Sequence, residues 1–121
     1  MLTRAQAKTI TDKALSLSKA DEAFVSLSDG TTAHLRFARN TPSTSGIYGE
    51  LSLTVTSSFG TRSAKASTTE QEPEAIEAAI RRSEELARIA PEDPEWVPLL
   101  EPQQCDRHTP AFDDATAQFP P

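Results

Sequence analysis

The sequence has few of the residues that build disulfide-stabilised or membrane-embedded proteins. A single cysteine, Cys105, stands among 121 residues, so no internal disulfide can form and nothing indicates an oxidising compartment. No window combines the length and hydrophobicity of a membrane span, and the first residues lack the apolar core of a signal peptide. We therefore expect a cytoplasmic protein that does not enter a membrane.

Basic side chains are also scarce. Twelve Lys and Arg stand against 18 Asp and Glu, giving a formal net charge of −6, and no stretch is densely basic. Proteins that bind nucleic acid release counterions from the phosphates through a basic face. The composition therefore argues against a nucleic-acid partner.

The length allows one compact domain with one modest core. We expect this domain to occupy residues 1–100, because residues 101–121 are rich in proline and read as a connecting tail toward an absent second domain. A helix is predicted from Thr3 to Ser18, where Thr3 and Gln6 can form a capping box. A second helix is predicted from Pro73 to Ala90, with exposed pairs Glu77–Arg81 and Glu84–Arg88.

Between the helices, the alternation of apolar and polar residues predicts four strands. The first begins at Ala23, and Asp29-Gly30 indicates a turn into a second strand that contains Ala33, Leu35 and Phe37. A three-residue turn places the apolar residues of both strands on one face, and it is preferred to a two-residue turn, which separates them. Thr32, His34, Arg36 and Ala38 then lie on the other face. Residues 40–49 read as a loop, followed by strands at 50–59 and 62–68.

The predicted fold class is therefore α+β: a helix, four mainly antiparallel strands and a helix, with the helices on one face of the sheet. The other face is expected to stay open.

No set of residues indicates catalysis. Cys105 and His108 have a spacing that can share a zinc ion, but a structural site needs four ligands and no second pair exists. His34 is more simply a strand residue on the open face, and the glutamates at 72–85 fit the solvated side of a helix. We predict no catalytic residue, no metal ligand and no cofactor in this chain.

Arg36, Arg39 and Asn40 are the candidate binding residues, and two interpretations of them stay open. Arginines at the edge of a sheet can simply keep that edge soluble and prevent aggregation. Alternatively, the edge or open face can receive an extended peptide or a strand of a partner.

Five stretches, in this order and at these spacings, resemble the N-terminal domain of the TldD/PmbA family, known as modulators of DNA gyrase: LRFARN, STSG, LSLTVTSSFG, RSAKAST and RRSEELARIAPEDPE. The resemblance runs from about Thr3 to Leu100 and, more loosely, through PAFDDATA. Ala64 departs from it, since a glycine is expected there. The resemblance implies zinc-dependent peptidases that work on flexible peptides as dimers of TldD-like and PmbA-like subunits.

The zinc motif of that family, HExxxH, belongs to a part that lies beyond Pro121, and neither histidine here is followed by Glu. The resemblance therefore implies a non-catalytic N-terminal domain that encloses peptide substrate or holds a partner subunit in a homo- or heterodimer, with zinc only in a missing C-terminal domain. A freestanding peptide- or protein-interaction module is the main alternative, and a small enzyme using His34 and Arg36 is a more distant one. An acidic domain gives no support to a gyrase connection.

Overall fold

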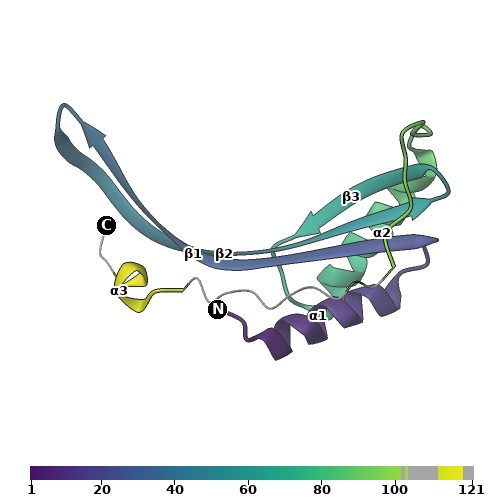
Figure 1. Cartoon of the computed structure of the whole chain (residues 1–121), viewed down its shortest axis with the longest axis horizontal. Helices are drawn as coiled ribbons and strands as arrows, with labels where there is room; N and C mark the ends of the chain where they lie inside the picture. The colour runs from purple at the N-terminus through teal and green to yellow at the C-terminus, as the bar shows by residue number, and fades with distance from the viewer. Residues whose placement is uncertain (102, 104–111, 119–121) are drawn as a thin grey trace. The chain divides into compact units, whose positions relative to one another are not determined.

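The computed structural model describes residues 1–101, 103 and 112–118. Along the chain the elements are α1 (Arg4–Leu17), β1 (Glu22–Ala38), β2 (Thr41–Phe59), β3 (Arg62–Thr68), α2 (Pro73–Ile89) and the short α3 (Asp114–Ala117) (Figure 1). Within the described residues this is an α+β arrangement of a helix, three antiparallel strands and a helix, as expected apart from the number of strands.

Both long helices begin where the sequence predicts. The Gln6 backbone amide donates to Thr3 Oγ1 at 3.3 Å, and the Thr3 amide donates to Gln6 Oε1 at 2.9 Å, which forms the expected capping box. Pro73 occupies the first turn of α2, where its missing N–H leaves no helical hydrogen bond unmade.

The sheet has the order β1-β2-β3. Strands β2 and β3 are antiparallel, with Val55 opposite Ala66 and Phe59 opposite Arg62, and Gly60 (φ +58°) lies in the turn between them. Position Ala64 pairs with Ser57 in the same ladder.

The prediction of four strands was wrong because β1 passes through Asp29 and Gly30 without turning. Gly30 is not among the residues with positive φ, and the Asp29 carboxylate is engaged by the chain's N-terminus, where it accepts the Leu2 backbone amide. The Met1 amino group lies 3.9 Å from the same Asp29 oxygen. The contact between Asp29 and the N-terminus of the chain therefore overrides the turn preference of the Asp-Gly pair.

The chain reverses instead at Arg39 and Asn40. Both have positive φ, 54° and 57°, as a two-residue type I′ turn requires. Residues 41–49, expected to be a loop, form the first half of β2. The first three predicted strands and the loop predicted at residues 40–49 are thus one long β-hairpin.

The described chain divides into two units, which are Met1–Gly30 with Gly49–Leu99, and Thr31–Tyr48 with the described residues after Leu99. The core belongs to the first unit and gathers residues of both helices, β1 and β2. Its buried members are Ala14, Leu53, Val55, Ile76 and Ile80, with Ile10, Leu17, Val25 and Leu27 packed against them. Both helices therefore cover the same face of this part of the sheet (Figure 1).

Candidate functional site

The three candidate binding residues lie together at the end of the β1–β2 hairpin. Arg36 is in β1, while Arg39 and Asn40 form the turn, and all three are exposed. Ser43, on the returning strand, donates its hydroxyl to the Arg36 carbonyl at 3.1 Å. Their role in binding stays a prediction. We call residues Thr31–Tyr48 the hairpin tip.

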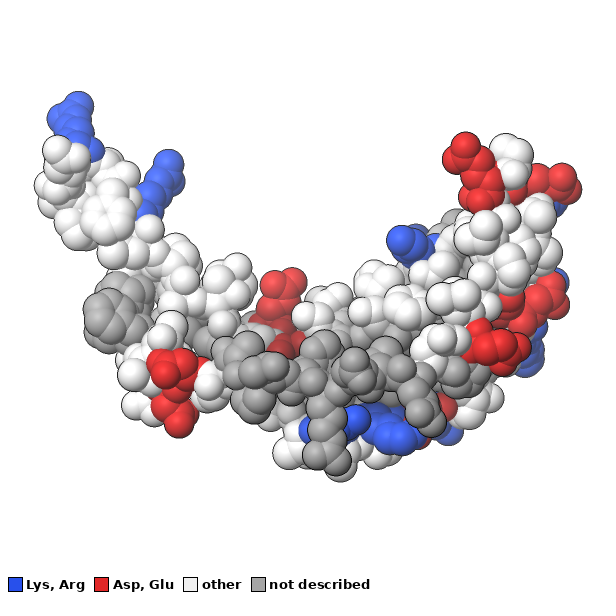
Figure 2. All heavy atoms as spheres, viewed as in Figure 1, with Lys and Arg blue, Asp and Glu red and all other residues white. Residues whose placement is uncertain are grey.

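The hairpin tip differs in charge from the rest of the protein. Arg36 and Arg39 are its only charged residues, so its formal charge is +2, whereas the remaining chain must carry −8 to reach the total of −6. Figure 2 shows basic side chains and no acidic ones at this end of the hairpin. No salt bridge to either arginine occurs within the described residues. The tip is therefore a cationic surface on an acidic protein.

The hairpin tip also exposes large apolar side chains. Leu35, Phe37, Ile47 and Tyr48 are 38%, 63%, 65% and 50% exposed. Side chains alternate between the two faces of a strand. Leu35 and Phe37 therefore share one face of the β1 half of the tip, while Arg36 lies on the opposite face. Polar and apolar side chains therefore alternate along the β1 half of the tip, with Arg36 as its one charged residue.

His34 and Tyr48 form a tilted aromatic pair across the hairpin, with ring centroids 6.1 Å apart. Gly46 lies beneath the imidazole, since a Cβ at this position would be 2.7 Å from His34 Cε1. Sequence reasoning treated Gly46 as a loop residue. The contact between Gly46 and His34 could not be predicted from the residues around Gly46, because it depends on how the two strands of the hairpin are aligned.

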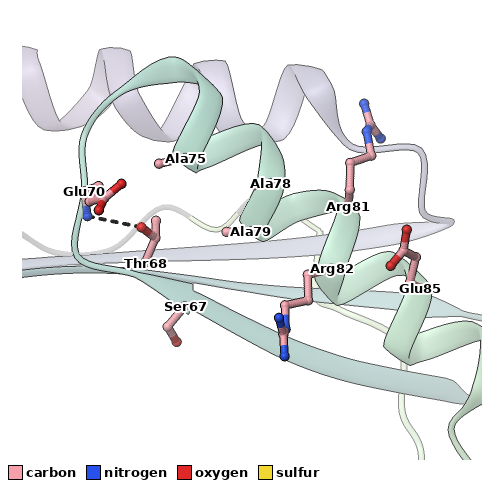
Figure 3. Close-up of a pocket in the computed structure, with 9 residues that line it drawn as sticks. All are labelled: Ser67, Thr68, Glu70, Ala75, Ala78, Ala79, Arg81, Arg82 and Glu85. Carbon is pink, nitrogen blue, oxygen red and sulfur yellow. Dashed lines mark hydrogen bonds between the residues drawn. The ribbon is translucent and has the colours of Figure 1, made fainter.

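A shallow groove of about 570 Å³ lies between β3 and α2 (Figure 3). Its lining consists of Ser67, Thr68, Glu70, Ala75, Ala78, Ala79, Arg81, Arg82 and Glu85. Several of its polar groups already have partners. Ser67 shares a 3.0 Å hydrogen bond with Thr54, and Thr68 Oγ1 accepts the Glu70 amide at 3.1 Å. The groove contains neither His34 nor Arg36, the residues of the enzyme hypothesis.

Glu84 is the one buried carboxylate of α2, and the predicted exposed pair with Arg88 was wrong. Its oxygens accept the Lys19 backbone amide at 2.5 Å and Arg81 Nη1 at 2.8 Å. Arg81 also lies 3.5 Å from Glu77, which confirms that predicted pair. Arg88 instead lies over the Phe59 ring, 4.0 Å from its centroid.

Burial raises the pKa of Glu84, but the hydrogen bonds from Lys19, Arg81 and Ser18 and the positive charge of Arg81 outweigh it. The pKa is therefore held below its ordinary value, and Glu84 is a charged structural group rather than a proton donor.

The described residues contain no group of three or more His, Cys, Asp or Glu side chains that is close enough to hold a metal ion. Cys105 and His108, the pair considered from sequence, lie outside the described residues. In the part of the chain that the structure describes, none of the helices is long and apolar enough to cross a membrane.

No family model matches the sequence, and no curated protein matches it. Among solved structures, TldE from Thermococcus kodakarensis is similar, with a TM-score of 0.68 and 18% sequence identity over 87% of this chain. This chain has the fold of a part of TldE. TldE is a member of the TldD/PmbA family, so the resemblance seen in the sequence is confirmed at the level of the fold. The matched region spans only 24% of the TldE chain.

Proposed function

We propose that this chain is the non-catalytic N-terminal domain of a TldD/PmbA-like metallopeptidase. The fold shared with TldE over 87% of the chain carries this proposal, and the five sequence stretches that resemble the family support it independently. In this role the domain contributes to the enclosure of peptide substrate and to subunit assembly in a cytoplasmic homo- or heterodimer. Zinc and the hydrolytic residues belong to a C-terminal domain outside this chain.

The distribution of chemistry within the chain supports binding rather than catalysis. Neither His34 nor His108 begins an HExxxH motif. The buried Glu84 is committed to hydrogen bonds that join α1 to α2. The hairpin tip instead combines four exposed large apolar side chains with two arginines and no acidic residue, a surface suited to contact another polypeptide.

A freestanding interaction module is the second candidate, and the exposed hairpin tip favours it equally. The reading frame that follows Pro121 separates the two. A frame that continues and encodes HExxxH supports a peptidase domain, and a long frame without that motif supports the partner subunit that lacks zinc. A stop codon directly after Pro121 favours the freestanding module.

Binding itself is tested on the isolated chain. We expect labelled, reduced and alkylated casein to bind it in fluorescence anisotropy, or the chain to associate with TldE or with itself in sedimentation velocity. The same casein with an equal amount of serum albumin is the control for nonspecific binding. Indifference to the unfolded protein, to TldE and to a second copy would contradict both candidates.

A further inference from the structure

The hairpin tip has an unpaired edge along β1. In the sheet order β1-β2-β3, β1 is an outer strand, and no described strand pairs with its other side. Strand β3 pairs only with Leu53–Phe59 of β2, so it does not reach the tip. Within the described residues, the tip is a two-stranded ribbon whose outer backbone N–H and C=O groups have no strand partner.

Such a ribbon is an incomplete structure on its own. A two-stranded hairpin is marginally stable in water unless a third strand or a helix packs on it. Every residue from Thr31 to Ser45 is exposed, including Leu35 and Phe37. Natural edge strands are usually shielded by proline, bulges or clustered charges. The β1 half of the tip, TTAHLRFA, has no proline and one arginine. This edge is thus suited to accept another strand.

The order of side chains on β1 determines what such a strand must contain. Leu35 and Phe37 lie on one face and Arg36 on the other, so an added strand, which alternates in the same way, meets an apolar row on one face and the single charge of Arg36 on the other. Opposite charges on neighbouring strands attract, and the tip has no carboxylate of its own to pair with Arg36. The matching ligand is therefore apolar on one face and acidic on the other.

We propose that the Thr31–Ala38 edge of β1 binds an extended peptide in which apolar and acidic residues alternate. This inference rests on the proposed function and names the class of peptide and the strand that receives it. Main-chain hydrogen bonds supply affinity, apolar side chains cover Leu35 and Phe37, and a carboxylate lies beside Arg36. The groove beside α2 is a weaker candidate because Ser67 and Thr68 already have partners.

The test is a charge exchange between protein and peptide. A short fluorescein-labelled peptide of alternating valine and glutamate is titrated with the wild-type chain, with Arg36→Glu and with Lys13→Glu. Lys13 is an exposed residue of α1 and gives the same change in net charge. We expect Arg36→Glu to weaken binding about fivefold or more, since an attraction becomes a repulsion, while Lys13→Glu has little effect. A valine–lysine peptide should bind Arg36→Glu better than wild type.

Strand pairing is tested on the peptide side. Methylation of alternate backbone amides of the valine–glutamate peptide removes its hydrogen-bond donors on one edge and should abolish binding. Circular dichroism shows whether each variant is folded. Equal binding to all three proteins, or unchanged binding of the methylated peptide, overturns this inference. If casein still binds under those conditions, the proposed function survives; if casein, TldE and self-association all fail as well, the proposed function fails too.

Discussion

Arg81 donates a hydrogen bond of 2.8 Å from Nη1 to Glu84 Oε2, and both residues also hydrogen-bond to the backbone at the end of α1. Arg81 Nη2 donates to the Leu17 carbonyl at 3.0 Å, and Glu84 accepts the Lys19 amide. Backbone groups at a helix C-terminus lack partners within the helix. Two side chains of α2 therefore satisfy the carbonyl of the last residue of α1 and a backbone amide just beyond it.

Replacing Glu84 with alanine should destabilise the domain. The Glu84 side chain is 6% exposed, and its loss leaves the Lys19 amide without its acceptor and removes one of the partners of Arg81. We expect the free energy of unfolding to fall by about 1.5 to 3 kcal/mol, the range for hydrogen bonds to charged groups. Urea denaturation measures this difference. Glu85→Ala is the matched control at an exposed neighbour and should change stability by less than about 0.5 kcal/mol. Equal effects of the two substitutions would contradict a role for the network.

The same network predicts an acid-sensitive stability. Because the folded state lowers the pKa of Glu84, its contribution is fully present above the ordinary pKa of 4.5 and is lost as pH falls through the lower folded-state pKa. Glu84→Gln removes the titrating group and should reduce the loss of stability in acid relative to wild type. Urea midpoints at a series of pH values from neutral to strongly acidic measure both slopes. Parallel curves for the two proteins would show that Glu84 does not contribute to the acid sensitivity.

The burial of Glu84 marks a limit of reasoning from local sequence. The capping residues Thr3 and Gln6 and the start of α2 at Pro73 are visible in the sequence because they depend on neighbours along the chain. The burial of Glu84 depends on the end of α1, more than sixty residues away. A glutamate four residues before an arginine on a helix predicts an exposed pair, and here a tertiary contact overrides it.

Two glycines provide a test of where the chain turns. Gly60 has φ +58°, and alanine in that conformation costs about 1 to 2 kcal/mol, so Gly60→Ala should destabilise the domain by that amount. Gly30 lies within β1 without a positive φ, so Gly30→Ala should be neutral or stabilise by up to about 1 kcal/mol. Neither added Cβ meets an atom within 4 Å, so steric contact does not confuse the comparison. A large loss of stability in Gly30→Ala would contradict a continuous β1 and support the turn that the sequence predicts at Asp29-Gly30.

The strand count could not be read from the sequence for a related reason. Asp-Gly is a strong turn signal, whereas Arg-Asn is a poor one, because arginine has no particular preference for the left-handed region. The contact of Asp29 with the chain's N-terminus occupies the carboxylate that a local turn would use. Arg36, Arg39 and Asn40 were nonetheless selected as candidates by their place between a strand pattern and a polar stretch. The hairpin explains why they lie close together.

Arg39 and Asn40 provide the last prediction. Holding a side chain such as that of Arg39 at φ 54° costs about 1 to 2 kcal/mol, and Asn-Gly is the preferred pair for a type I′ turn. The double variant Arg39→Asn, Asn40→Gly should therefore stabilise the hairpin tip. Hydrogen exchange of the Arg36 and Ser43 amides, which face each other across the hairpin, reports on this region better than global unfolding, because local openings occur below the global free energy. We expect slower exchange there and no change at Val55 in the core.

The same variant separates the stability of the hairpin tip from its charge. It lowers the formal charge of the tip from +2 to +1 while keeping Arg36. If Arg36 is the residue that meets the carboxylate of a bound strand, the stabilised variant should bind the valine–glutamate peptide at least as tightly as wild type, since a better-ordered edge loses less entropy on binding. If amide exchange in the tip becomes slower and the peptide nevertheless binds more weakly, the charge that attracts the peptide is that of Arg39 rather than that of Arg36.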